Sequence, residues 1–407
     1  MRPKIFYGWT VAAVVFCAFM ISVGPRQTFS MFLLAFLEEF GGSRSRIAGV
    51  FSVHIIFYGL SGWGLGVLVD RVGPRKVLIG STMVWAATLL ICSQVREFWQ
   101  LYLVFGVVGG LADGGISYVP NNAVIARWFV RYRGLATGWV LAALPLGAAL
   151  FAPVAQWGIS RVGWRSTYAL FGVLVITTSL PLLVGLLRDD PRELGLQPDG
   201  RPEGSAVSRK TATVDTARGF PTGYWRIFCA NILRGMSMYA LVVHVAPYLV
   251  DVGFSKMAAA TAFSGTFLLA TIGGLLAGAL SDRIGRLPTY AGIAGLYVVG
   301  YCSLLATRPG HGWILGLCLV TAGLASGGAP PVFAALLTDR LQGPRLGHLL
   351  GLQNIGFSFG SMLGPFLAGL AFDWFGKYTL AFVCMAAAMV GSSVLASMTT
   401  QNRLSRA

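Results

Sequence analysis

The chain carries the stretch Gly66-Val-Leu-Val-Asp70-Arg71-Val-Gly73-Pro74-Arg75-Lys76 between two apolar runs. A related stretch, Gly278-Ala-Leu-Ser-Asp282-Arg283-Ile-Gly285-Arg286, returns in the second half of the chain. Gly110-Leu-Ala-Asp-Gly-Gly115 is echoed in the same way by Gly323-Leu-Ala-Ser-Gly-Gly328. Markers that recur in the same order at almost the same spacing indicate two copies of one structural unit.

Apolar residues dominate the chain and come in long runs. Hydrophobic residues make up 55% of the 407 residues and charged residues only 11%, whereas about a quarter of a soluble domain is charged. A helix of roughly twenty apolar residues crosses the hydrocarbon core of a bilayer. We therefore predict an all-α membrane protein with twelve transmembrane helices in two pseudo-symmetric six-helix bundles.

One polar stretch, from Arg188 to Thr222, interrupts the apolar pattern near the middle and holds few large apolar residues. The predicted domains are an N-terminal six-helix bundle over 1–187, a cytoplasmic linker over 188–222 and a C-terminal six-helix bundle over 223–407. The formal net charge is +16, and the basic residues gather in loops on the side that holds both termini. Both termini are therefore predicted to be cytoplasmic, and this topology explains the charge without nucleic acid as a partner.

Local motifs supply a family resemblance over essentially the whole chain. The Gly66–Lys76 stretch resembles the loop signature of the major facilitator superfamily. Phe6-Tyr7-Gly8-Trp9, Arg127-Trp128-Phe129 and the linker segment Glu193-Leu-Gly-Leu-Gln-Pro-Asp-Gly200 are similar to motifs of bacterial relatives of the monocarboxylate and oxalate/formate transporters. The resemblance implies the major facilitator fold, a bacterial inner membrane location and a monomeric functional unit.

Three ionisable residues, Arg26, Asp113 and Arg234, lie well inside apolar runs. Charges at that depth are costly and mark functional sites in membrane proteins. The resemblance implies that their helices line a central cavity, and that Arg26 stands where the family often carries lysine. Arginine can hold an anion but is a poor proton carrier. Two alternatives stay open: the arginines bind an anionic substrate, or Asp113 neutralises them within the protein.

Helical spacing adds polar neighbours to these residues. The candidate substrate-binding residues are Arg26, Arg234, Ser22, Ser30, Ser117, Asn121, Ser237 and His244. Asp113, with His244 as a second candidate, is the predicted proton-coupling residue, because burial and a nearby charge both affect the protonation of a carboxyl group. A conformational latch, with charge-assisted bonds that break in another state, is predicted from the loop residues Asp70, Arg71, Arg75, Asp282, Arg283 and Arg286.

These observations predict a secondary active transporter of a small organic anion similar to a monocarboxylate, coupled to protons and working by alternating access in the lipid bilayer. The sequence has no G-x-x-x-x-G-K-[ST] motif for ATP and no catalytic constellation, so neither an enzyme nor a cofactor or metal is expected. The alternatives are a transporter of another solute class, such as a drug or other anion exporter or an anion exchanger, and a non-transporting membrane sensor.

Overall fold

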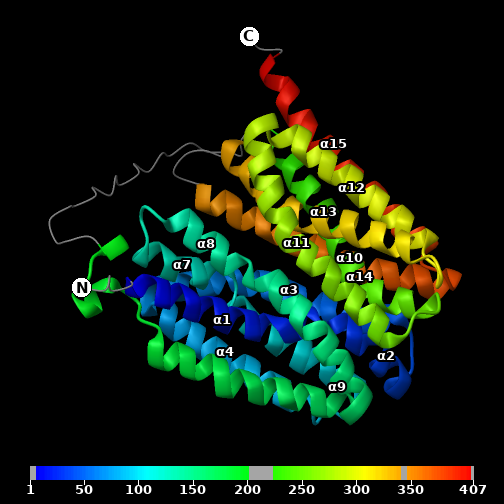
Figure 1. Cartoon of the computed structure of the whole chain (residues 1–407), viewed down its shortest axis with the longest axis horizontal. Coiled ribbons are helices and arrows are strands. Elements are labelled where there is room, and N and C mark those ends of the chain that lie inside the picture. The colour runs from blue at the N-terminus through cyan, green and yellow to red at the C-terminus, as the bar shows by residue number, and fades with distance from the viewer. Residues whose placement is uncertain (1–5, 201–222, 341–345, 405–407) are drawn as a thin grey trace. The chain divides into compact units, whose positions relative to one another are not determined.

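The computed structural model describes residues 6–200, 223–340 and 346–404, and all regular elements in these ranges are helical (Figure 1). The elements of the first half are α1 (Tyr7–Gln27), α2 (Phe29–Phe40), α3 (Arg44–Val72), α4 (Pro74–Cys92), α5 (Phe98–Leu101), η1 (Tyr102–Gly109), α6 (Gly110–Gly114), α7 (Tyr118–Trp128), α8 (Arg133–Leu141), α9 (Ala143–Leu174), η2 (Val175–Ser179), η3 (Leu182–Leu186), η4 (Pro191–Leu194) and η5 (Pro198–Gly200). Those of the second half are α10 (Tyr224–Asp251), α11 (Lys256–Ile284), α12 (Arg286–Ala306), α13 (Gly312–Arg340), α14 (Leu346–Phe375) and α15 (Thr379–Leu404).

Within the described residues, ten helical stretches are long and apolar enough to cross a membrane, or eleven if the bent α3 is one span. One stretch, Arg133–Leu186, has 54 residues, which is about 81 Å of helix and far more than a bilayer requires. It contains Gly163 with φ 83° and ψ 163°, a conformation outside any helix. Dividing the stretch at Gly163 yields the twelve predicted spans, and the all-helical transmembrane fold is confirmed.

The chain packs as two compact units. The first unit comprises the described parts of Met1–Gln27, Phe57–Phe151 and Gly158–Thr211. The second comprises the described parts of Thr28–Ile56, Ala152–Trp157 and Ala212–Ala407. Residues 28–56, which the sequence assigns to the first bundle, thus pack with the second half of the chain. The division into bundles over 1–187 and 223–407 with a linker over 188–222 remains a prediction, and residues 201–222 lie outside the described residues.

Close helix contacts hold the second unit together. Helix α10 packs against α14 and α15, α11 packs against α13, and α12 packs against α13 and α15. Glycine permits the contact between α10 and α14: a Cβ atom on Gly360 would lie 1.9 Å from the carbonyl oxygen of Ile232, and one on Gly364 would lie 2.2 Å from that of Met236. Small residues let membrane helices approach this closely, so the backbone of α10 is held tightly where it carries Arg234.

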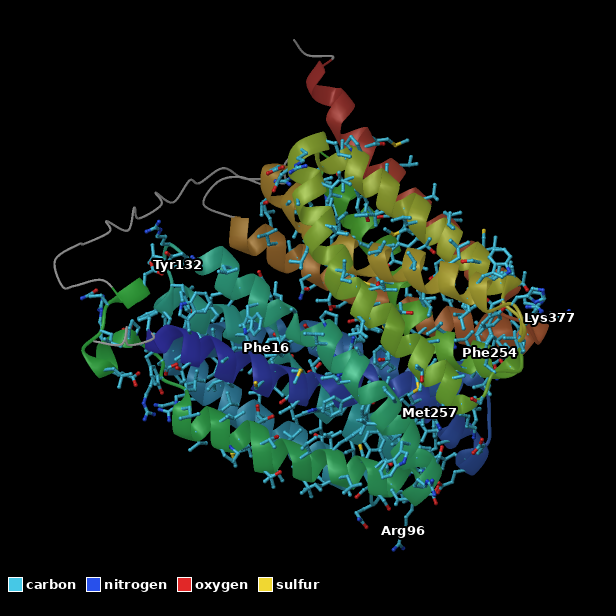
Figure 2. All side chains as sticks on the ribbon, viewed as in Figure 1. Phe16, Arg96, Tyr132, Phe254, Met257 and Lys377 are labelled. Atoms are coloured by element: carbon cyan, nitrogen blue, oxygen red, sulfur yellow. The ribbon has the colours of Figure 1, made fainter. Side chains whose placement is uncertain are left out.

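Large apolar side chains cover the outer faces of the helices. Leu275 is 73% exposed, Leu276 59% and Val383 53%, an arrangement that water penalises and a bilayer favours. Charged side chains stand in the turns between helices, as Arg96 and Lys377 do in Figure 2. The surface thus has the polarity pattern of a protein that spans a membrane.

Candidate functional site

Arg26 and Asp113 form a buried ion pair in the first unit. Arg26 Nη1 donates to Asp113 Oδ2, and the two side chains are only 2% and 1% exposed. Arg26 Nε also donates to Gln27 Oε1 at 3.2 Å, and its guanidinium carbon lies 5.2 Å from the ring centre of Tyr58. The structure therefore brings two of the three predicted ionisable residues together, and Asp113 neutralises Arg26.

Asp113 lies on the short helix α6, which ends just before a break in the span. Ser117 Oγ donates to the carbonyl oxygen of Gly114 at 2.6 Å, and Asn121 Nδ2 donates to the carbonyl oxygens of Ile116 and Ser117 at 2.7 and 2.9 Å. A broken helix inside a membrane needs partners for its released carbonyl groups. Ser117 and Asn121 supply these partners between α6 and α7.

Ser22 and Ser30 belong to different units because the helix is interrupted at Thr28, between α1 and α2. Ser22 Oγ lies 3.4 Å from Ser179 Oγ, and Trp85 Nε1 donates to the carbonyl oxygen of Ser22 at 2.8 Å. Ser30 Oγ donates to the carbonyl oxygen of Val243 on α10 at 2.8 Å. Each serine therefore links neighbouring helices within its own unit.

Arg234 lies on α10 in the second unit and is 7% exposed. Asn231 Oδ1 accepts from Arg234 Nε at 3.1 Å and from Nη2 at 2.8 Å. The guanidinium carbon is 4.2 Å from the ring centre of Phe357 and 4.9 Å from that of Phe333.

The counter-ion that would be expected for such a buried charge is absent from the described part of the chain. Arg234 Nη1 is buried with no hydrogen-bond partner there, and no carboxylate there forms an ion pair with Arg234. Removing an ion from water costs several kcal/mol unless it is paired, and two aromatic contacts return only about 1–4 kcal/mol. Arg234 thus carries a buried positive charge that no carboxylate among the described residues compensates.

Ser237 and His244 lie on α10 beyond Arg234 and contact other helices. The Tyr301 hydroxyl donates to the carbonyl oxygen of Ser237 at 2.6 Å. His244 Nε2 lies 2.8 Å from the carbonyl oxygen of Pro365, which can only accept, so Nε2 carries a proton. His244 Nδ1 lies 2.9 Å from the Tyr378 hydroxyl, so in the neutral ring Nδ1 accepts from that hydroxyl.

The Tyr378 hydroxyl leads to a cluster that the sequence analysis did not identify, here named the Arg44 junction and made of Arg44, Asp251, Asp373 and Tyr378. Arg44 Nη1 and Nη2 donate to the two carboxylate oxygens of Asp251 at 2.5 and 2.7 Å, and Nη1 also donates to the Tyr378 hydroxyl at 2.8 Å. Asp373 Oδ1 and Oδ2 accept from the backbone N–H groups of Arg44 and Ser45 at 2.8 and 2.9 Å. The junction fastens the start of α3 to the ends of α10 and α14.

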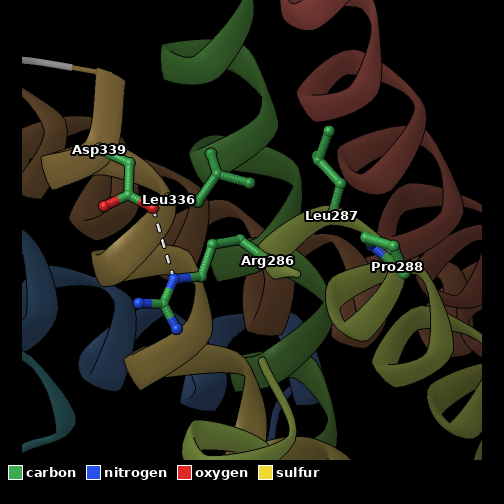
Figure 3. Close-up of a pocket in the computed structure, with 5 residues that line it drawn as sticks. All are labelled: Arg286, Leu287, Pro288, Leu336 and Asp339. Atoms are coloured by element: carbon green, nitrogen blue, oxygen red, sulfur yellow. Dashed lines mark hydrogen bonds and ion pairs between the residues drawn. The ribbon is translucent and has the colours of Figure 1, made fainter. Parts of the chain in front are cut away.

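The six predicted latch residues have unlike surroundings in the two repeats. Arg286 donates to Asp282, to Ser281 Oγ at 2.7 Å and to Asp339 Oδ2 at 3.4 Å. Arg286 and Asp339 also line a pocket of about 290 Å³ with Leu287, Pro288 and Leu336 (Figure 3).

In the first repeat, Arg75 Nη2 donates to the carbonyl oxygen of Val184 at 2.6 Å, and its backbone N–H donates to Asp189 at 2.8 Å. Asp70, Arg71 and Arg283 take part in no ion pair within the described ranges. The start of the predicted linker is anchored as well, because Asp199 accepts from the backbone N–H groups of Val130 and Arg131 at 3.1 and 2.6 Å.

The model of the Major Facilitator Superfamily matches residues 14–260 and 227–405. The chain belongs to this superfamily. It is therefore a transporter by family and not an enzyme.

Three curated relatives resemble this major facilitator chain along most of their length. The uncharacterized MFS-type transporter YcxA of Bacillus subtilis (strain 168) is 26% identical, covering 97% of this chain and 95% of that protein. Monocarboxylate transporter 13 of Bos taurus is 26% identical, covering 97% and 89% of the two chains. Monocarboxylate transporter 2 of Homo sapiens is 26% identical, covering 96% and 85%.

A solved structure supports the major facilitator fold directly. A bacterial homolog of the human lysosomal transporter Spinster, in an inward-facing and unoccupied conformation, matches with a TM-score of 0.72 at 16% identity. The match covers 98% of this chain and 96% of the other.

Proposed function

We propose that this major facilitator protein transports a small organic anion of the monocarboxylate type, coupled to protons, by alternating access. The observation that carries the proposal is Arg234, a buried guanidinium without a carboxylate partner among the described residues. A carboxylate substrate would supply the missing charge through charge-assisted hydrogen bonds. The names of the mammalian relatives, monocarboxylate transporters 13 and 2, favour the same class of solute.

The test is uptake of labelled lactate, pyruvate, formate and oxalate into proteoliposomes, with and without an inward proton gradient. We expect at least one of these acids to accumulate, and the gradient to accelerate its uptake. Uptake that depends only on an internal anion would indicate an exchanger. If folded protein carries none of the acids, the proposed substrate class is wrong and another solute, such as a drug, becomes the better hypothesis.

Proton coupling is assigned to the Arg26–Asp113 pair. Protonation of Asp113 would remove the negative partner of Arg26, so it would change the charge of the first unit by one at a buried position. His244 is a weaker candidate, because both of its ring nitrogens are engaged by Pro365 and Tyr378.

Asp113→Asn is expected to abolish the stimulation of uptake by external acid, because the amide cannot gain or lose the coupling proton. Exchange of labelled for unlabelled anion, which needs no net proton movement, should persist within a few-fold of wild type. The measurement is initial uptake between pH 5 and pH 8, together with counterflow at one pH. A variant with the wild-type pH profile would remove Asp113 from the coupling mechanism.

Alternating access requires a contact that closes one side of the transporter and later opens. We propose that the Arg44 junction is such a contact, because it joins α3 to α10 and α14 through a bidentate ion pair whose members are only 11% and 30% exposed. The predicted latch would act at the opposite ends of the helices; its residues are Asp70, Arg71, Arg75, Asp282, Arg283 and Arg286.

We also propose that the protein lies in the bacterial inner membrane, that both of its termini are cytoplasmic and that its functional unit is a monomer.

Arg44→Gln is expected to weaken the junction, because it removes both bonds to Asp251 and the bond to Tyr378. If the junction loses about 1.4–3 kcal/mol of stabilising free energy, the population in which this gate is open should increase by roughly 10- to 100-fold. The readout is the alkylation rate of Ser30→Cys, a position that is 1% exposed, in protein lacking its native cysteines. Lys256→Gln, which breaks an exposed pair with Glu38, is the control. Equal alkylation rates of Ser30→Cys in protein with Arg44 and in protein with Arg44→Gln would contradict the proposed gate.

A further inference from the structure

The surroundings of Arg234 define more than an unpaired charge. The amide of Asn231 is oriented by its bonds: Nδ2 donates to the carbonyl oxygen of Gln353 on α14 at 2.7 Å. Oδ1 therefore turns toward Arg234 and accepts from Nε and Nη2. A guanidinium offers five N–H groups in one plane. Asn231 occupies the edge formed by Nε and Nη2, and this leaves the edge that carries Nη1.

Two aromatic rings contact the same guanidinium. The ring centres of Phe357 and Phe333 lie 4.2 and 4.9 Å from its central carbon. Cations are attracted to ring faces, and the rings keep water away from this position. Among the described residues, two rings and Asn231 thus surround the guanidinium, and Nη1 is the nitrogen that is left without a hydrogen-bond partner for a ligand to meet.

A second polar atom without a partner lies in this region. The Tyr297 hydroxyl on α12 is buried and has no hydrogen bond within the described chain. One turn further along α12, the Tyr301 hydroxyl donates to the carbonyl oxygen of Ser237, which lies one turn beyond Arg234 on α10.

Tyr290, two turns earlier on α12, is satisfied: its hydroxyl is bonded to Ser392 Oγ at 2.8 Å, and Ser392 Oγ donates to the carbonyl oxygen of Ala230, one turn before Arg234, at 2.6 Å. Tyr297 therefore lies between the turns of α12 that match Ala230 and Ser237 on α10, at the level of Arg234. Buried polar groups are nearly always satisfied, so two unsatisfied ones at the same level of neighbouring helices indicate a site for a polar ligand.

We infer that Arg234 Nη1 and the Tyr297 hydroxyl together bind one carboxylate group, with Asn231 as the positioning residue that aims Nη1 at it. This inference rests on the proposed function and names the residues of its anion site. Both groups donate hydrogen bonds and a carboxylate only accepts them, so donors and acceptors match. Because one cation is unneutralised at this site, one carboxylate balances it.

Asn231→Asp provides a sharp test, because it changes charge with almost no change in shape. The new carboxylate would stand 2.8–3.1 Å from the guanidinium nitrogens and act as an internal counter-ion. We expect carboxylate uptake to fall at least 10-fold, and the ligand-free protein to unfold at a higher temperature than wild type. Gln94→Glu, which adds the same charge at an exposed position in the turn after α4, should alter neither property.

Tyr297→Phe tests the second donor by removing only the hydroxyl. The concentration of formate for half-maximal stabilisation of the purified protein should rise about 10-fold or more, as for a lost hydrogen bond to a charged group. Tyr301→Phe, which removes a hydroxyl bonded to the Ser237 carbonyl group, should reduce thermal stability and leave the formate affinity unchanged.

The outcomes separate this site from the proposed function. If wild-type protein carries a carboxylate while Asn231→Asp and Tyr297→Phe keep wild-type affinity, the site is overturned and the proposed function stands. If wild-type protein neither carries nor binds any carboxylate, both are overturned. If both variants lose affinity for the carboxylate while the control variants keep it, the result supports the site and the proposed function together.

Discussion

Replacing Arg234 by Gln is expected to reduce carboxylate uptake by about 30-fold or more without destabilising the protein. The loss follows because one member of a buried charge-assisted contact is removed, which costs about 2–5 kcal/mol, or roughly 30- to 5,000-fold in affinity. Folding should be unaffected or improved, because Arg234 has no carboxylate partner among the described residues and its desolvation is unfavourable.

The comparison uses uptake in proteoliposomes and thermal unfolding of the same preparations. Arg226→Gln is the matched control, because Arg226 is an exposed arginine on the same helix and its loss should change neither property. Uptake by Arg234→Gln within a few-fold of wild type would exclude Arg234 as an anion ligand. A strongly destabilised variant would show that Arg234 is neutralised within the protein after all.

Arg26→Gln is expected to have the opposite effect on stability, lowering the free energy of unfolding by about 3–5 kcal/mol. Asp113 would then remain as a buried carboxylate without its positive partner. The double variant Arg26→Gln/Asp113→Asn removes both charges and should recover most of the loss, because two neutral amides can bond to each other.

Thermal unfolding of wild type, both single variants and the double variant forms a double-mutant cycle that isolates the interaction between the two residues. A strong interaction, with the double variant more stable than Arg26→Gln, is the expected result. Additive effects of the two substitutions would mean that the pair does not stabilise the fold.

The repeated motifs and apolar runs were sufficient to predict the fold. The echo of Gly66–Lys76 at Gly278–Arg286 indicated two related halves, and the length of the apolar runs indicated membrane helices. The rarity of charge inside apolar runs also singled out Arg26, Asp113 and Arg234. These conclusions depend on local composition and spacing, which a sequence carries directly.

Local composition and spacing could not predict which residues far apart in the sequence pair with each other. Arg26 and Arg234 both follow the pattern of a buried arginine, and only the folded structure shows that Asp113 pairs with Arg26. Arg44 was missed because it stands at the polar end of a span, where basic residues usually set topology. Tyr297, the second donor that we propose, was missed because a tyrosine in an apolar run resembles ordinary packing. Asn231, one helical turn before Arg234, was detectable from its i, i+3 spacing.

The most direct test of the central claim, that this protein binds small carboxylates at Arg234, is thermal unfolding of purified wild-type protein with formate, lactate or pyruvate and with the corresponding neutral amides. A ligand at about 100 times its dissociation constant stabilises the folded state by roughly 2.7 kcal/mol. At least one acid should raise the unfolding temperature at a concentration where its amide does not, and Arg234→Gln should abolish the difference. Equal stabilisation by acid and amide, or stabilisation that survives in Arg234→Gln, would contradict the account.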